Sequence, residues 1–357
     1  MKKWFHRILS SALTALLAVS LVSGAPVFAE DSSSAVREFT DSVGRTVSVP
    51  AEIKSIAPSG PLAQLILYTA YPDRLAGVAK AFGKKQVKYF PEKYTQLPEF
   101  GQFYGGKGNL NKEELLAAKL DIIIDLGEPK KTMKEDMDGV QAQLNIPTVF
   151  IEAKLPEIDK AYEKLEELLG ATPETEQIKN YIRETLKQAK DVKASLKDEN
   201  KVSVYWAMGD DGLSTNAEAS FQSEVLQLVG ADNVAKVEAV SKGGGTQVSF
   251  EELLTWKPSI IIADNEELAK TIQENDTWQN FLKETGAKLV IAPQVPYGVL
   301  SNPPSVNRIL GIKWLGNLLY PDLYKVDIQK EVSEFCQLFY HFEPSEDQLK
   351  EILNELE

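Results

Sequence analysis

Cysteine and histidine are scarce in this sequence of 357 residues. It contains a single cysteine, Cys336, and two histidines, His6 and His341. A disulfide framework and a thiolate zinc site both need paired or clustered cysteines, so the sequence excludes both. Two histidines so far apart are also too few for an imidazole metal cluster. We therefore predict a protein with no resident metal and no cofactor.

Basic residues are in the minority. The sequence has 39 lysines and arginines against 52 aspartates and glutamates, which gives a formal net charge of -13. A protein that holds a phosphate backbone needs a basic stripe, so we do not expect nucleic acid as a partner. The hydrophobic fraction of 43% and the charged fraction of 25% are ordinary for a globular protein, and the length is sufficient for two domains.

Familiar catalytic motifs are missing as well. The sequence has no Gly-x-Ser-x-Gly elbow, no phosphate-binding Gly-Lys loop and no His-Glu-x-x-His pair. We therefore predict that the chain is not an enzyme and assign no catalytic residue. Two alternatives stay open: an exported enzyme that uses a carboxylate pair such as Glu128 and Asp211, and an adhesin or structural protein, which would show no ligand-dependent closure.

The first 29 residues have the pattern of a secretory signal peptide. Lys2, Lys3 and Arg7 precede an uncharged run over residues 8–22, and small residues follow up to Ala29, the predicted cleavage site. The run is short for a membrane span, which needs about 20 apolar residues. No cysteine follows it, so lipid attachment is not expected. We predict an exported, soluble chain, periplasmic or otherwise outside the cytoplasm.

Short apolar runs alternate with helical patterns twice in the remaining chain. This alternation indicates open α/β sheets in two lobes, each sheet mostly parallel. The predicted strands cover residues 53–57, 75–79, 121–125, 148–151, 202–206, 259–263 and 288–291. Residues 122–124 and 260–262 are uninterrupted isoleucines, which is typical of parallel strands covered by helices on both faces.

One long helix is predicted between the lobes, from about Glu174 to Lys197. The segment has no glycine or internal proline, and Thr172-Pro173 marks its start. At 1.5 Å per residue it would span roughly 35 Å, enough to reach from one lobe to the other. Further helices are expected from Pro303-Pro304 to Leu319, over 328–340 and over 345–356. The predicted organisation is a signal peptide (1–29), an N-terminal lobe (30–172), an interdomain helix (173–200), a C-terminal lobe (201–302) and C-terminal helices that complete the lobes (303–357).

Two segments of the sequence resemble each other. Residues 112–124 and 250–262 both contain a short helix with paired glutamates, a lysine turn and a buried strand, and Glu113 aligns with Glu251. Chance similarity of two helix-turn-strand units is the simpler explanation. The matched register of the two glutamates makes that explanation less attractive.

With these units in place, the sequence resembles the substrate-binding proteins of ABC importers, in the class with a rigid interdomain helix that serves ferric siderophores, haem and cobalamin. Further marks of the resemblance are residues 41–47 ahead of the first strand, and segments 303–308 and 335–340 near the end. It implies a monomer that docks on a permease dimer, with Glu113 and Glu251 entering arginine pockets on the two subunits. The alternative is that both glutamates merely favour the first turn of a helix.

A ligand is expected between the lobes, because ligands of open α/β sheets bind outside the carboxyl ends of the strands. Aromatic groups among glycine and amide residues suit a large, partly apolar ligand. For the aromatic residues the alternative is packing, for Ser59 a helix cap, and for Asp211 turn chemistry. The candidate contacts are Ser59, Gly60, Phe103, Tyr104, Glu128, Trp206, Asp211, Asn265, Tyr297 and Asn302.

Departures from better-known members of the class narrow the expected ligand. Cobalamin binders carry a tryptophan where this chain has Leu126, and haem binders that ligate through tyrosine carry it where this chain has Gln102. The resemblance therefore implies an iron chelate, a ferric siderophore by default. Cobalamin, haem and a molybdate or tungstate oxyanion remain alternatives, and the oxyanion would use backbone N–H groups at Ser59 and Gly60.

Overall fold

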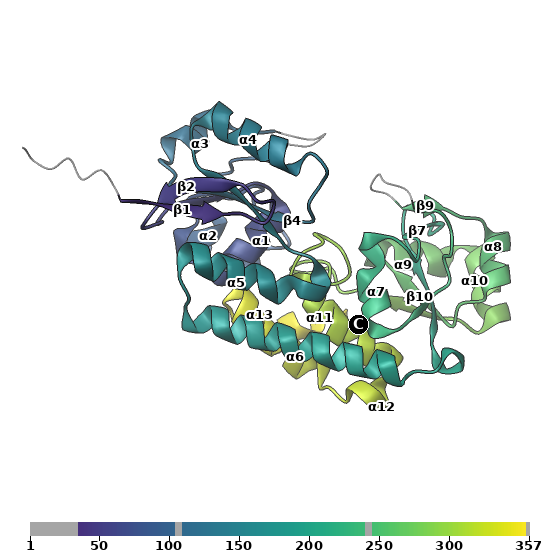
Figure 1. Ribbon diagram of the computed structural model, residues 1–357. Helices are drawn as coiled ribbons and strands as arrows, with labels where there is room; N and C mark the ends of the chain where they lie inside the picture. The colour runs from purple at the N-terminus through teal and green to yellow at the C-terminus, as the bar shows by residue number, and fades with distance from the viewer. Residues whose placement is uncertain (1–34, 104–108, 240–244, 355–357) are drawn as a thin grey trace, which may run out of the picture.

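The chain forms two α/β lobes above one long helix (Figure 1). The computed structural model describes residues 35–103, 109–239 and 245–354, and the predicted signal peptide lies outside them. No helix in these ranges combines the length and apolar character needed to cross a membrane. The predicted fold class, two α/β lobes with parallel sheets, is confirmed.

The first lobe contains a parallel sheet of order β3-β4-β5, made of β3 (Ile56–Pro58), β4 (Ile122–Gly127) and β5 (Thr148–Glu152). Residues of β4 face two separate hydrophobic clusters. Ile122 and Ile124 pack in the main core with α1 (Pro61–Ala70) and α5 (Ile158–Leu169). Ile123 packs in a second cluster with residues of α3 (Lys112–Ala117) and α4 (Met133–Leu144). Because both faces are covered, the strand is apolar without alternation.

The second lobe repeats this plan. Its sheet has the order β11-β10-β6-β8, all parallel, with β6 (Ser203–Ala207), β8 (Asp232–Asn233), β10 (Ile260–Ala263) and β11 (Lys288–Ile291). Ile260 and Ile262 face the main core, whereas Ile261 faces a separate cluster. The other elements of this lobe are β7 (Ser214–Thr215), β9 (Thr246–Gln247), α7 (Glu224–Val229), α8 (Phe250–Trp256), α9 (Glu266–Glu274) and α10 (Asp276–Thr285).

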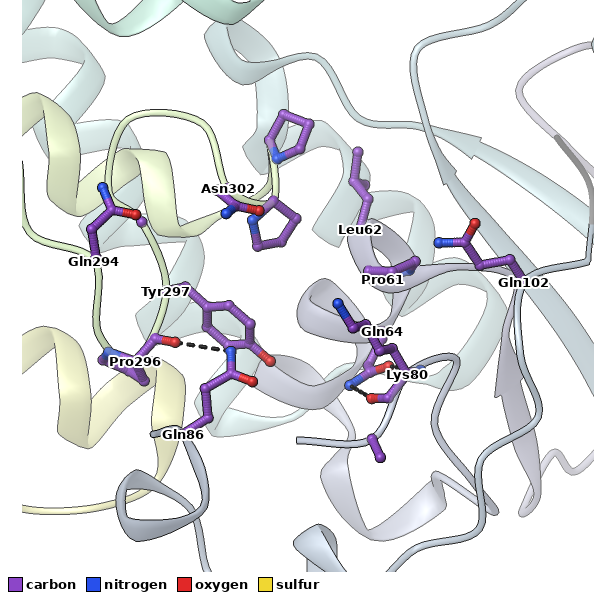
Figure 2. A pocket seen from close by; sticks show the side chains of 14 residues that line it. Pro61, Leu62, Gln64, Lys80, Gln86, Gln102, Gln294, Pro296, Tyr297 and Asn302 are labelled. Atoms are coloured by element: carbon purple, nitrogen blue, oxygen red, sulfur yellow. Dashed lines mark hydrogen bonds between the residues drawn. The ribbon is translucent and has the colours of Figure 1, made fainter. Parts of the chain in front are cut away.

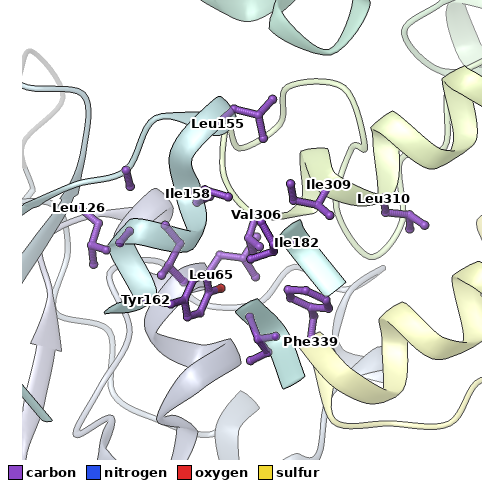
Figure 3. Packing of buried hydrophobic residues seen from close by; sticks show 14 of the residues in the cluster. Leu65, Leu126, Leu155, Ile158, Tyr162, Ile182, Val306, Ile309, Leu310 and Phe339 are labelled. Carbon is purple, nitrogen blue, oxygen red and sulfur yellow. The ribbon is translucent and has the colours of Figure 1, made fainter. Parts of the chain in front are cut away.

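Helix α6 (Pro173–Ser195) is the predicted long helix, and it runs beneath both lobes (Figure 1). Thr172 and Thr175 form a capping box at its start, with Pro173 in the first turn. Ile178 and Ile182 are fully buried in a core shared with α1, α5, α11 (Asn307–Leu319) and α13 (Ile328–Tyr340), as Figure 3 shows. The helix also contacts α7 of the second lobe, so it joins the lobes by packing as well as by connectivity.

Three elements differ from the prediction. The predicted strand over 75–79 makes only isolated bridges, Ile56 with Leu75 and Val78 with Glu99. Val78 N donates to the carbonyl of Pro98, but proline has no N–H to return the bond, so the ladder cannot extend there. The hairpin β1 (Val36–Thr40) and β2 (Thr46–Pro50) was not predicted. The last helices are α12 (Pro321–Tyr324) and α14 (Glu346–Ile352), and α14 is shorter than the predicted 345–356.

Candidate ligand-binding site

A polar cavity of about 470 Å³ lies between two distant parts of the chain. One side comes from the start of α1, the segment that follows residue 79, and Gln102 (Figure 2). The other side comes from the loop after β11. The described residues that line it are Pro61, Leu62, Gln64, Lys80, Ala81, Gln86, Gln102, Gln294, Pro296, Tyr297, Gly298, Asn302, Pro303 and Pro304.

The first wall begins where β3 ends. Ser59 N donates to the carbonyl of Ile124 (3.1 Å), and the hydroxyl of buried Ser59 donates to the carboxylate of Asp125. Gly60 then caps α1 in an extended conformation, and Pro61 fixes the first turn. The amino end of α1 therefore borders the cavity at the carboxyl edge of the sheet, where the topology places ligands.

Lys80 is held at the cavity by a glutamine. The side chain of Gln64 accepts a hydrogen bond from Lys80 N (2.9 Å) and donates one to the Lys80 carbonyl (3.1 Å), as the dashed lines in Figure 2 show. Gln64 is itself buried, so it fixes the backbone at this point. The side chain of Lys80 is exposed, and it is the one charged group among the described lining residues.

The second wall is tied to the first. Gln86 Nε2 donates to the carbonyl of Pro296 (3.0 Å), and Ser305 Oγ donates to the carbonyl of Leu62 (3.1 Å). The ring of Tyr297 lies 5.8 Å from that of Phe90, and burial raises the pKa of Tyr297, so its hydroxyl is neutral at physiological pH. The cavity thus offers amide groups, a phenol and one ammonium, which together suit an oxygen-rich anion.

Several predicted contacts lie at this cavity. Tyr297 and Asn302 line it, and Ser59 and Gly60 directly precede its Pro61 wall. The hydroxyl of Ser59 is engaged with Asp125, so only its backbone is available. Phe103 is partly buried against the cluster around Phe100 and Leu115. Tyr104 lies outside the described residues, and Glu128 is exposed.

The predicted contacts of the second lobe have local partners. Trp206 is 1% exposed and its indole donates to Asp264 Oδ1 (3.2 Å), so it packs in the core. Asp211 accepts from Leu213 N (2.9 Å) in a turn between two left-handed glycines. Asn265 caps α9 by accepting from Leu268 N (2.9 Å). None of the three lines the cavity, and their role as ligand contacts stays a prediction.

Sequence reasoning missed the glutamines and the lysine of the cavity. Gln64, Gln86 and Gln294 lie on a helix and in loops with no motif of their own. Lys80 had a usable signal, because it directly follows the predicted strand over 75–79 and so belongs at a carboxyl edge. Within the described part of the chain, no cluster of three or more His, Cys, Asp or Glu side chains could hold a metal ion.

The two glutamates of the internal repeat lie on exposed helix starts. Glu113 is in the first turn of α3 and Glu251 in the first turn of α8, and both side chains are exposed. Neither carboxylate has a hydrogen-bond or ion-pair partner among the residues that the structure describes. Both are therefore available to a partner.

The chain is similar to known binding proteins over most of its length. A family model described as periplasmic binding protein matches residues 67–285. The molybdate-binding protein of Haemophilus influenzae is 26% identical over 341 residues, with 87% of this chain and 92% of that protein covered. A vitamin B12-binding protein of Pectobacterium atrosepticum is 24% identical over 276 residues, which cover 69% and 87% of the two chains.

A solved structure gives the same picture. The ABC transporter solute-binding protein of Sulfurospirillum deleyianum matches with a TM-score of 0.79 and 28% identity, and the match covers 89% of this chain and 99% of that one. All three relatives are described as binding proteins. Their names differ in the ligand, so the ligand of this chain has to be argued from its own cavity.

Proposed function

Because the chain belongs to the periplasmic binding protein family, we propose that it captures an oxygen-rich anionic solute in the cavity of Figure 2 and delivers it to the permease of an ABC importer. The observation that carries the proposal is the lining of the cavity. It combines side-chain amides, the Tyr297 phenol and the Lys80 ammonium, and no carboxylate occurs among its described residues. Such donors match the oxygens of an anion.

An iron chelate of the siderophore type is the first candidate for this solute. The cavity volume of about 470 Å³ is in the range that accommodates a drug-sized ligand. Amide, phenol and ammonium groups are hydrogen-bond donors to ligand oxygens, whereas iron is bound by the chelator itself. The protein would then recognise the outer oxygens and the net charge of a preformed complex.

Molybdate is the second candidate. The Haemophilus influenzae relative, which is named for this anion, aligns with 87% of the chain. The amino end of α1, with its free backbone N–H groups, borders the cavity and provides a favourable site for a small oxyanion. A complex with molybdate would require the walls to approach each other more closely than a larger chelate does.

Isothermal titration calorimetry on the chain without its first 29 residues tests the proposal. The panel contains a ferric tris-hydroxamate, a ferric tris-catecholate, sodium molybdate, sodium sulfate and cyanocobalamin. Binding of a ferric chelate or of molybdate, with sulfate at least a hundredfold weaker, supports the proposal and selects between its two candidates. Binding of cyanocobalamin with none of the anions would overturn it.

For delivery, we propose that Glu113 and Glu251 each pair with an arginine on one of the two permease subunits. Charge-assisted carboxylate–guanidinium contacts are strong and directional, and two of them fix the orientation of the docked protein. The test is the double variant Glu113→Ala, Glu251→Ala, assayed for stimulation of the importer's ATPase. Stimulation should be lost while ligand affinity is unchanged, and Glu266→Ala, an exposed glutamate of α9, serves as the control.

A further inference from the structure

The helix-turn-strand units α3–β4 and α8–β10 match in structural detail. Asn111 caps α3 by accepting from Glu114 N (3.3 Å), and Ser249 caps α8 by accepting from Glu252 N (3.2 Å). After the helices, Lys119 (φ 50°) and Lys257 (φ 47°) both adopt the left-handed conformation. Their strands begin at Ile122 and Ile260. The same sequence interval separates every one of these pairs, so the repeat is structural as well as sequential.

Each unit has one buried and one exposed leucine in the same order. Leu115 and Leu253 are fully buried, whereas the following Leu116 is 56% exposed and Leu254 is 38% exposed. Among the described residues the other exposed large hydrophobic side chains are those of Val36, Val87 and Leu323. A single exposed leucine needs no explanation. Exposure at the equivalent position of both units is a pattern that packing within the chain does not require.

The exposed leucines lie beside the unpaired carboxylates. Leu116 follows Glu113 by three residues and Leu254 follows Glu251 by three, so each pair shares a helix face. By contrast, Glu252 is engaged at home, since its carboxylate accepts from Ser249 N (2.7 Å). Each unit therefore presents the same two-part surface, a free carboxylate next to an apolar side chain.

We infer that Leu116 and Leu254 are the apolar half of the surface that docks on the permease, where each enters a recess beside the basic group that receives Glu113 or Glu251. The inference rests on the proposed docking of those two glutamates. Two copies of one patch in a single chain fit a partner with two copies of its complement, which a pair of like subunits provides. Each permease subunit would present an apolar recess flanked by a cation.

A second copy of this chain is a poorer occupant of the patch. The chain has a net charge of -13, and each patch contains a free carboxylate, so two copies would bring like charges together. A basic recess on a membrane subunit reverses that sign. Burial of the leucines would then exclude water from the carboxylate contact and strengthen it.

The test is the double variant Leu116→Gln, Leu254→Gln, with Leu323→Gln as the matched control. Leu323 is 46% exposed on α12, which lies below α6 and away from α3 (Figure 1). Affinity is measured by surface plasmon resonance against the importer's permease and ATPase complex in nanodiscs. We expect the double variant to bind at least about tenfold more weakly and the control to match the wild type. Thermal melting should be unchanged in both, because the three leucines are on the surface.

Two further results separate this inference from the docking proposal. If Glu113→Ala, Glu251→Ala abolishes binding but the leucine variant binds like the wild type, the inference is wrong and the docking proposal stands. If neither variant changes the affinity, both are wrong. A photo-crosslinking residue at position 116 or 254 should form adducts with the permease subunits in whole cells, and adducts with a second copy of the chain would overturn the inference.

Discussion

Arg45 Nη1 lies 2.9 Å from the carboxylate of Asp41, and both side chains are buried. The same carboxylate accepts from Arg45 N (2.9 Å), and the guanidinium also donates to the carbonyl of Thr148 (2.8 Å). The pair closes the hairpin of β1 and β2 and fastens it to the edge strand β5. This explains why residues 41–47 are a recognisable mark in the sequence, since both ends of the turn are needed for one buried contact.

Replacement of Arg45 by methionine should therefore reduce the free energy of unfolding by about 3–5 kcal/mol, because it leaves a buried carboxylate without its partner. Urea unfolding followed by circular dichroism measures the loss. The double variant Asp41→Asn, Arg45→Met should recover part of it. In the exposed pair of Lys54 and Glu52, Lys54→Met should cost less than about 1 kcal/mol. Equal losses at the two sites would contradict this account.

His341 makes the stability depend on pH. Burial lowers the pKa of His341, although a hydrogen bond to the carbonyl of Tyr68 and the charge of Asp73 act in the opposite direction. A histidine with a lowered pKa stabilises the fold above its unfolded pKa of about 6.5, and this contribution is lost as the pH falls through the folded value. The melting temperature should drop as the pH is lowered from 7 to 5.

The variant His341→Asn isolates this effect. Position 341 has a left-handed backbone (φ 58°) at the end of α13, a conformation that asparagine tolerates well. The drop in melting temperature between pH 7 and pH 5 should be smaller in the variant than in the wild type. Identical pH profiles for the two proteins would show that His341 does not carry the dependence.

How far the sequence predicts this structure depends on the length of each element. The long helix, β4 and β10 have strong signals, because an uninterrupted apolar run or a 23-residue helical pattern has few alternatives. Strands of two residues such as β7 and β8 leave no such pattern. They form where neighbouring loops happen to meet, and only the three-dimensional arrangement determines that.

The candidate site was predictable only in part, for a related reason. Topology predicts that the loop containing Tyr297 and Asn302 faces the cleft. It does not predict that Gln64, from the second turn of a helix, would clamp the backbone at Lys80. Trp206 illustrates the opposite error, since a tryptophan at a strand end has the composition of a ligand contact and the position of a core residue. Only the packing distinguishes the two.

Lys80 should dominate the affinity for an anion. Removal of a charged hydrogen-bond donor typically costs enough to weaken binding by about tenfold or more. Lys80→Met should therefore bind molybdate or a ferric chelate, whichever the calorimetry selects, at least about tenfold more weakly. Lys84→Met, at an exposed lysine that does not line the cavity, is the control. A loss of equal size in both variants would assign the effect to the overall charge of the segment.

Asp264 is a buried carboxyl at the end of β10 that should destabilise the protein at neutral pH. Burial raises the pKa of Asp264, although the hydrogen bond from the Trp206 indole opposes the shift. A carboxyl with a raised pKa favours the fold while it is protonated, and this advantage disappears as the pH rises through the folded value. Asp264→Asn keeps an oxygen for the indole and removes the charge. The variant should be more stable than the wild type at pH 7, and the difference should shrink towards pH 4, as measured by thermal melting at each pH. Asp210→Asn, at an exposed carboxylate, should show no such trend. If Asp264→Asn is less stable at pH 7, the ionised carboxylate itself is needed at this end of the sheet, and its position near the carboxyl edge would then indicate a role in binding.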